Sequence, residues 1–258
     1  MKLFLKKIFN LSLMIKVRNF FNLRPLNIDK TKLKGKVSIS DSFCWRTDNN
    51  FKTIVRFSDI LKTFYNLENS QVHMKIYSKD YKLIKEIEFS KLENLNEYII
   101  SKENLNGLES YGTFFLFHKF HDEKKSDIYI SNRCYLGFSK NENLYSFVHG
   151  NTLSKYVTMD NYSKIKSDLV QRTFLNYSSK YKIQNYFDNS FENEIFLANP
   201  TSKKIRYKVN NVSKTLKNGE SIVIKINDKN TILIESNCLF FRPIVFSSKN
   251  EYLDVYHG

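Results

Sequence analysis

The sequence predicts an all-β protein built from two tandem antiparallel β-sandwiches, and three observations support this class. Short runs rich in Val, Ile, Tyr and Phe alternate with clusters of Asn, Asp, Ser and Lys, as in chains of many short strands joined by tight turns. Hydrophobic residues make up 41% of the 258 residues, enough to bury a core in one large domain or two ordinary ones. The third observation is a repeated ending, FSKNENLYSFVHG at 138–150 and FSSKNEYLDVYHG at 246–258, which indicates internal duplication.

Residues 1–36 are predicted to form a basic N-terminal extension. Positions 1–28 contain no acidic residue, and their six cations are Lys2, Lys6, Lys7, Lys16, Arg18 and Arg24. The longest uncharged run, Ile8 to Ile15, is too short to span a bilayer, and its apolar positions do not gather on one helical face. Three interpretations stay open: an extension docked on the fold, a segment that contacts an anionic membrane surface, or an uncleaved secretion signal.

The first and larger sandwich is predicted to span residues 37–152. Asp59 to Leu67 is expected to form one short helix or a wide loop, and Ser78-Lys79-Asp80 a hairpin turn. The expected strands are 37–41, 51–57, 72–78, 81–89, 97–102, 111–119, 127–131, 133–139 and 144–148.

Residues 153–180 are expected to form a hydrophilic connector, with a helix over 163–173, before a smaller second sandwich at 181–258. Asn218-Gly219 predicts a turn between two strands of this sandwich. The expected strands are 181–187, 194–199, 203–209, 220–226, 230–236, 239–246 and 252–256. With Asn199-Pro200-Thr201 and the Asn-Gly turn, this part resembles immunoglobulin-like bacterial sandwiches; jelly-roll-like modules fit the same pattern. The resemblance implies a fold rather than an activity.

Several residues mark the repeat. Asp41 and Phe43 near the start of the first sandwich correspond to Asp188 and Phe191 near the start of the second, and Val37 to Phe51 is the same interval as Tyr181 to Ile195. The endings place Gly150 and Gly258 in equivalent positions, after His149 and His257. The two histidines either close the last strand of each sandwich or contribute to two equivalent ligand sites, or to one shared site.

The charge of the chain favours a lysine-rich solvated surface over nucleic-acid binding. The formal net charge is +15, but only eight of the 41 basic residues are Arg, the residue that best recognises phosphates and base edges. The single alanine and the abundance of Asn, Ile, Phe, Tyr and Lys are typical of a bacterial protein from an AT-rich genome. Three cysteines without a CxxC spacing imply neither a zinc site nor a disulfide framework. They favour a reducing compartment, so the expected location is cytoplasmic. A position at the periphery of a membrane is the alternative that the basic N-terminus leaves open.

A divalent metal site is the alternative to a protein without a cofactor. Gly112, His118, His121 and Glu123 resemble the first metal motif of cupins, which are also β-sandwiches, and His149 could add a ligand. This sequence departs from that motif because two residues separate the histidines, which places them on opposite faces of a regular strand. The resemblance implies a metal-dependent enzyme.

Trp45, Arg46 and Asp48 are the remaining candidate ligand-binding residues, in a loop that follows the first strand. An exposed Trp beside an Arg can stack on a sugar or anchor an interface, whereas a buried Trp would only fill the core. No hydrolase, P-loop or dinucleotide-binding motif is present, and Glu86/Glu88 and Glu192/Glu194 fit solvated strand faces. The expected function is therefore non-enzymatic: recognition of a glycan or protein partner, with the handling of bacterial surface polysaccharide as the suggested context.

Overall fold

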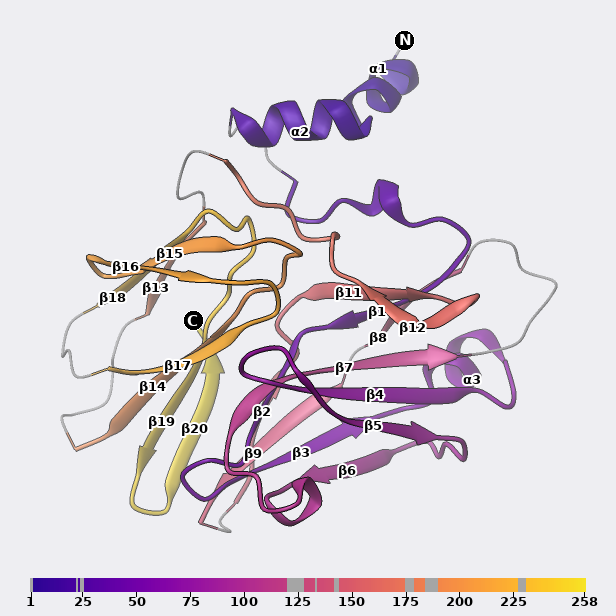
Figure 1. Cartoon of the computed structure of the whole chain (residues 1–258). Coiled ribbons are helices and arrows are strands. Elements are labelled where there is room, and N and C mark those ends of the chain that lie inside the picture. Colours follow the sequence, from indigo (N-terminus) through magenta and orange to yellow (C-terminus); the bar gives the residue numbers. More distant parts are fainter. Residues whose placement is uncertain are drawn as a thin grey trace.

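The computed structural model shows an all-β protein with 53% strand and 12% helix, which confirms the predicted class (Figure 1). It describes residues 2–21, 23, 26–119, 128–132, 134–141, 144–174, 179–183, 190–226 and 231–258, except the side chains of 2, 3, 128–130 and 132. Within these residues the strands form five four-stranded sheets. The division is therefore finer than the two sandwiches expected from the sequence.

The first part of the chain contributes three sheets. Its strands are β1 (Lys36–Asp41), β2 (Phe43–Arg46), β3 (Phe51–Phe57), β4 (Gln71–Ser78), β5 (Leu83–Phe89), β6 (Asn96–Ile100), β7 (Tyr111–Lys119), β8 (Ile128–Asn132), β9 (Tyr135–Lys140), β10 (Ser146–His149), β11 (Leu153–Thr158) and β12 (Asn161–Lys166). Sheet 1 has the order β12-β11-β1-β8, sheet 2 the order β2-β7-β4-β5, and sheet 3 the order β10-β9-β3-β6. The β1–β8 pair is parallel, and the other pairs of the described strands are antiparallel.

The second part of the chain forms two sheets, drawn in salmon, orange and yellow on the left of Figure 1. Its strands are β13 (Ser179–Ile183), β14 (Glu192–Ala198), β15 (Ile205–Val209), β16 (Val212–Leu216), β17 (Ser221–Ile226), β18 (Ile232–Ser236), β19 (Ile244–Lys249) and β20 (Tyr252–His257). Sheet 4 has the order β13-β18-β15-β16 and sheet 5 the order β17-β14-β19-β20.

Sheets 2 and 3 repeat the strand order of sheets 4 and 5. Counting the eight strands of each pair from its first strand gives the order 1-6-3-4 in sheets 2 and 4, and 8-7-2-5 in sheets 3 and 5. The strand equivalent to β13 is thus β2, so the match of Val37 with Tyr181 is wrong. Val37 lies in β1 of sheet 1, which the second part does not repeat among its described strands.

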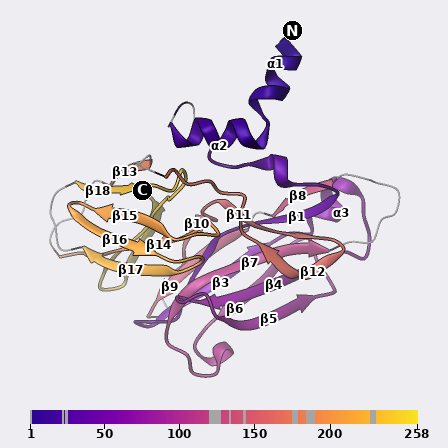
Figure 2. The ribbon, with the colours of Figure 1, turned by 45° about the horizontal axis from the view of Figure 1, so that its top comes forward.

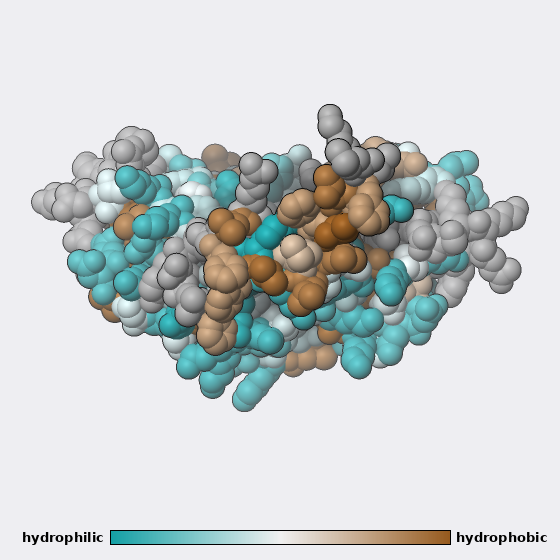
Figure 3. All heavy atoms as spheres, turned by 90° about the horizontal axis from the view of Figure 1, so that it is seen from above, coloured by the Kyte–Doolittle hydropathy of each residue, from teal (hydrophilic) through white to brown (hydrophobic). Residues whose placement is uncertain are grey.

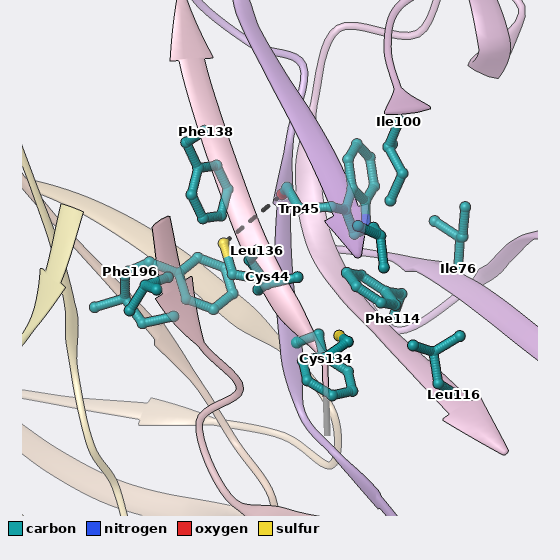
Figure 4. Packing of buried hydrophobic residues seen from close by; sticks show 14 of the residues in the cluster. Cys44, Trp45, Ile76, Ile100, Phe114, Leu116, Cys134, Leu136, Phe138 and Phe196 are labelled. Carbon is teal, nitrogen blue, oxygen red and sulfur yellow. Dashed lines mark hydrogen bonds between the residues drawn. The ribbon is translucent and has the colours of Figure 1, made fainter. Parts of the chain in front are cut away.

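Sheet 5 joins the two parts because both of its faces are buried. Successive residues of a strand point to opposite faces, so Ile195 and Leu197 enter the core shared with sheet 4. Phe196 and Ala198 enter the core of the first part, with Cys44, Trp45, Phe138 and other residues of sheets 2 and 3 (Figure 4). Two separate sandwiches would each keep a solvated outer face. A shared core explains why the chain does not form two independent ones.

The expected connector helix over residues 163–173 is wrong. Residues 153–166 instead form the β11–β12 hairpin, in which β11 pairs with β1 of the first part. Val170 and Arg172 form isolated bridges with Ile28 and Cys238. The β-branched and aromatic residues of this segment satisfy their backbone groups by pairing with β1, an option that the local pattern did not reveal.

Helices are few and short, and two of them lie at the N-terminus. They are α1 (Lys2–Phe9), α2 (Ser12–Phe20) and α3 (Ile60–Tyr65), with 3-10 turns η1 (Lys30–Lys32) and η2 (Glu103–Leu105). In Figure 2, α2 lies across the body and α1 extends away from it. Brown, apolar side chains gather on this face when it is viewed from above (Figure 3). None of the helices that the structure describes is long and apolar enough to cross a membrane.

Candidate functional site

A groove of about 840 Å³ opens where β3 ends and β6 and β9 begin, and we call it the aromatic groove. Such a volume suits a ligand or a short peptide segment. Six of its lining residues are apolar or aromatic and four are polar: Phe57, Ile60, Phe64, Leu95, Tyr135 and Phe147, and Arg56, Ser58, Thr63 and Asn94.

The register of sheet 3 aligns the polar and aromatic groups beside this groove. Arg56 of β3 lies opposite Glu97 on one side and Tyr135 on the other, and Tyr135 lies opposite His149. Arg56 Nε donates to Glu97 at 2.9 Å, and the rings of Tyr135 and His149 are 4.7 Å apart. The outer face of sheet 3 thus presents a row of four side chains: the carboxylate of Glu97, the guanidinium of Arg56 and the rings of Tyr135 and His149.

Gly137 lets the Phe147 ring approach this face closely. A Cβ at Gly137 would stand 2.4 Å from Ile54 Cγ2 and 2.7 Å from the Phe147 ring, closer than such atoms approach. The Arg56 guanidinium lies 4.9 Å from the centre of the same ring, a cation–π distance. The absence of a side chain at one position therefore shapes the floor of the groove.

The opposite wall is held by α3. Asp59 Oδ1 accepts hydrogen bonds from the backbone N–H groups of Leu61 and Lys62, and Ser70 Oγ donates to Oδ2 at 2.7 Å. These bonds satisfy free donors at the helix start, and Leu61 anchors the helix in the interior. Phe64 on the same helix is left 76% exposed at the groove. Of the two alternatives expected for Asp59 to Leu67, a short helix or a wide loop, the structure shows the short helix.

The structure brings together the two histidines of the repeated ending. His257 Nε2 donates to the backbone carbonyl of His149 at 3.2 Å, and Ser146 Oγ accepts from Val255 N–H at 2.9 Å. Burial, aided by the Arg242 charge, lowers the pKa of His257 to about 4, so this ring is neutral at pH 7. The histidines therefore close their strands and join the two parts of the chain.

A second cavity, of about 360 Å³, lies beside His149 at this junction. It is lined by Ile28, Asp41, Cys134, His149, Gly150, Thr152, Leu153 and Phe240. Burial, with a smaller contribution from the Asp41 charge, raises the pKa of the Cys134 thiol well above its usual value. The thiol stays protonated at neutral pH, the opposite of what an activated cysteine nucleophile requires.

Trp45, Arg46 and Asp48 lie between the two parts of the chain instead of at a surface loop. Trp45 and Arg46 belong to β2 and are fully buried. Trp45 Nε1 donates to the Tyr77 carbonyl at 2.8 Å, and Arg46 binds Asp48 through two nitrogens and Glu194 at 2.6 Å. No face of the Trp45 ring is open to a sugar, so Trp45 fills the core.

The residues of the repeat signature also have structural surroundings. Phe43 is fully buried and stacks on Phe114, and a Cβ at Gly150 would meet the Phe43 ring and Asp41. Gly258 N–H donates to the Pro243 carbonyl at 3.2 Å. Phe191 packs edge-on against Tyr252, and Asp188 lies outside the described residues.

Of the residues proposed for a metal, the structure describes His118 and His149, while His121 and Glu123 lie outside the described part. His118 is in β7 of sheet 2 and His149 in β10 of sheet 3. Within the described part of the chain, no group of three His, Cys, Asp or Glu residues could hold a metal ion. His118 is fully buried, and neither of its ring nitrogens has a hydrogen-bond partner of ordinary geometry.

His118 is expected to make stability pH-dependent. Burial lowers its pKa from 6.5 to about 4, opposed by the nearby Asp59 carboxylate and Ser58 carbonyl. The unfolded chain binds the proton of this histidine more tightly than the folded chain does. The stability of the fold with a neutral His118 is therefore complete above the unfolded pKa and is lost as the pH falls from 6.5 to about 4. The free energy of unfolding, measured with urea, is expected to fall by about 3 kcal/mol over this pH range. In the variant His118→Phe it should fall by less. A variant whose stability depends on pH as the wild type's does would contradict the assignment to His118.

The sequence did not indicate the aromatic groove. Arg56, Tyr135 and Phe147 are far apart in the chain and carry no motif. The one signal that could have pointed to them is alternation: Arg56 and Tyr135 occupy outward positions, between inward residues such as Val55 and Leu136.

Comparison with protein-family models gives no match, and comparison with curated proteins gives none either. Among solved structures, the chain is similar to the major pilin protein T3.2 of Streptococcus pyogenes serotype GAS13637. The identity is 12%, the alignment covers 85% of this chain and 91% of the pilin, and the TM-score is 0.22. A score this low carries no argument about fold or function.

Proposed function

We propose that this chain is a non-enzymatic recognition protein that binds an extended segment of a partner protein in the aromatic groove. The observation that carries the proposal is the groove itself, an open hollow walled by Phe64 and Leu95, two apolar side chains that nothing in the described chain covers. Exposed apolar residues gathered around a hollow are typical of interaction sites.

A protein segment fits this groove better than a glycan does. Sugars need several free donors and acceptors, but the groove offers four polar residues against six apolar or aromatic ones, and Arg56 already donates its Nε–H to Glu97 and lies against the Phe147 ring. The apolar walls suit a bulky apolar side chain of a peptide, and the exposed Tyr135 at the groove can bind its polar backbone, as can His149, whose ring lies beside that of Tyr135.

We also propose that the two parts of the chain arose by duplication of one β-sandwich module, immunoglobulin-like or jelly-roll-like in style. The equal strand orders of sheets 2 and 3 and of sheets 4 and 5 support this, as does the placement of His149 and His257 at the ends of β10 and β20. The aromatic groove would then be a feature of the first copy, because α3 and the segment before β6 build it.

Selection of a displayed random-peptide library on the full chain tests the proposed function. Enriched peptides are expected to carry a bulky apolar anchor and to bind the double variant Phe64→Ser/Leu95→Ser about tenfold more weakly or worse. The matched control is Leu144→Ser/Val212→Ser, which removes two exposed apolar side chains elsewhere. A glycan array is screened with the same variants.

Peptides that bind the wild type and the groove variant equally would contradict the proposal. Glycans that bind only when Phe64 and Leu95 are present would replace the protein partner with a carbohydrate one. Because both side chains are exposed, the groove variant is expected to unfold at the same urea concentration as the wild type.

A further inference from the structure

We infer that the N-terminal segment of residues 4–21 and 23, which we call the docking segment, binds the surface of an anionic lipid bilayer. Nine of its large apolar side chains are exposed: Phe4, Leu5, Phe9, Leu11, Leu13, Val17, Phe20, Phe21 and Leu23. Leu13 is 71% exposed. The brown patch of Figure 3 lies on the face that carries this segment.

The body of the protein covers little of the docking segment. In α2, Ile15 and Asn19 are the buried residues, and the Asn19 side chain accepts a hydrogen bond from Leu26 N–H at 3.0 Å. The ring of Phe20 stacks on that of Phe174, with the two ring centres 6.3 Å apart. These contacts fix α2 to the body along one narrow side and leave its remaining apolar side chains facing outward.

The charges of the segment identify the partner as an anionic surface. Lys6, Lys7 and Lys16 are exposed among the apolar residues, and the first acidic residue of the chain is Asp29. A second copy of this chain would bring the same cations together, which is unfavourable. An anionic bilayer offers both phosphate-rich headgroups and an apolar interior at a depth that short helices reach.

The lengths of α1 and α2 fit a segment that lies in the membrane surface. They contain eight and nine residues and are separated by a break at Asn10–Leu11, and α2 lacks a side-chain N-cap. Helices this short are marginal in water, so burial of their apolar side chains in the bilayer interface would stabilise them.

Flotation of the full chain with lipid vesicles tests this inference. The protein is expected to float with vesicles of three parts phosphatidylcholine and one part phosphatidylserine, and much less with pure phosphatidylcholine. Leu13→Ser/Phe21→Ser is expected to weaken the partition about tenfold or more, since each removes an apolar side chain from the interface. Lys6→Gln/Lys7→Gln should weaken it about tenfold on the anionic vesicles only, with a reduced dependence on salt.

Matched controls separate this effect from general stickiness and general charge. Leu144→Ser removes a 91% exposed leucine outside the segment, and Lys214→Gln/Lys225→Gln removes two exposed lysines of the second part. Both are expected to float like the wild type. Trp45 fluorescence reports the fold of every variant, because this single tryptophan is buried far from the substituted side chains in sequence.

Three results would overturn the inference. The first is a wild-type protein that does not float with the anionic vesicles, and the second is a loss of binding by the control variants as large as that of the segment variants. The third is sedimentation that shows self-association abolished by Leu13→Ser/Phe21→Ser, which would assign the apolar face to a second copy. Neither result bears on the aromatic groove, which the peptide selection tests separately.

Discussion

Replacing Arg46 with methionine is expected to lower the free energy of unfolding by about 3–5 kcal/mol. The guanidinium is fully buried and is the shared partner of Asp48 and Glu194, which belong to different parts of the chain. Burial alone would lower the pKa of Arg46, but the hydrogen bonds and charges of these two carboxylates outweigh it and raise the pKa. The substitution leaves both carboxylates without their cation in a mostly buried place.

Urea unfolding followed by Trp45 fluorescence measures the loss, and Arg56→Met is the matched control. Arg56 also pairs with one carboxylate, Glu97, but both side chains are about two-fifths exposed, so its loss should cost at most about 1 kcal/mol. The double variant Arg46→Met/Glu194→Leu should recover part of the stability, because it removes one unpaired charge. Equal costs for Arg46→Met and Arg56→Met would show that burial of the ion pair contributes nothing.

Replacing Lys155 with methionine is expected to raise the free energy of unfolding at pH 7 by about 3–4 kcal/mol. Lys155 of β11 is fully buried, with its Nζ 3.4 Å from Asn218 Oδ1 and 4.9 Å from the centre of the Tyr81 ring. No acidic side chain is paired with it among the described residues. Burial lowers its pKa from 10.5 to about 7. Methionine keeps the length of the side chain and removes the charge.

The pH dependence distinguishes this explanation from simple repacking. Between pH 7 and 10.5 the unfolded chain holds the proton that the folded chain releases, so wild-type stability should rise with pH over this range. Relative to the variant Lys155→Met, the wild-type protein should gain about 2 kcal/mol of unfolding free energy between pH 7 and pH 9. The exposed control Lys214→Met should stay within about 0.5 kcal/mol of the wild type throughout. A constant difference between wild type and Lys155→Met would contradict a buried charge.

Local pattern was enough to locate most strands. The expected ranges 51–57 and 111–119 coincide with β3 and β7, and most other strands differ from expectation by one to three residues. β2, β11, β12 and β16 were not predicted. β11 and β12 lie in the segment expected to be a connector. β2 and β16 are short, and β2 contains Trp45-Arg46, whose burial depends on Glu194 from the other part of the chain.

The candidate sites were far less accessible to sequence reasoning. Trp45 and Arg46 stood out because tryptophan and arginine are rare in this chain, yet packing against sheet 5 makes them structural. Glu194 was expected on a solvated strand face, but it faces Arg46 because β14 is buried on both sides. The aromatic groove depends on the register Arg56–Tyr135–His149 across three strands, which no local pattern encodes.

The sequence by itself determined the all-β class, most strand positions, the repeated ending and the basic, acid-free N-terminus. These follow from alternation, turn residues and charge, which act over a few neighbouring residues. Only the tertiary structure decided which strands share a sheet, that sheet 5 unites the two parts, and which side chains stay exposed. Pairing and burial join residues more than a hundred positions apart, as Arg46 and Glu194 show. Such contacts are fixed by the packing of whole sheets, so the functional surfaces emerge only once the sheets are in place.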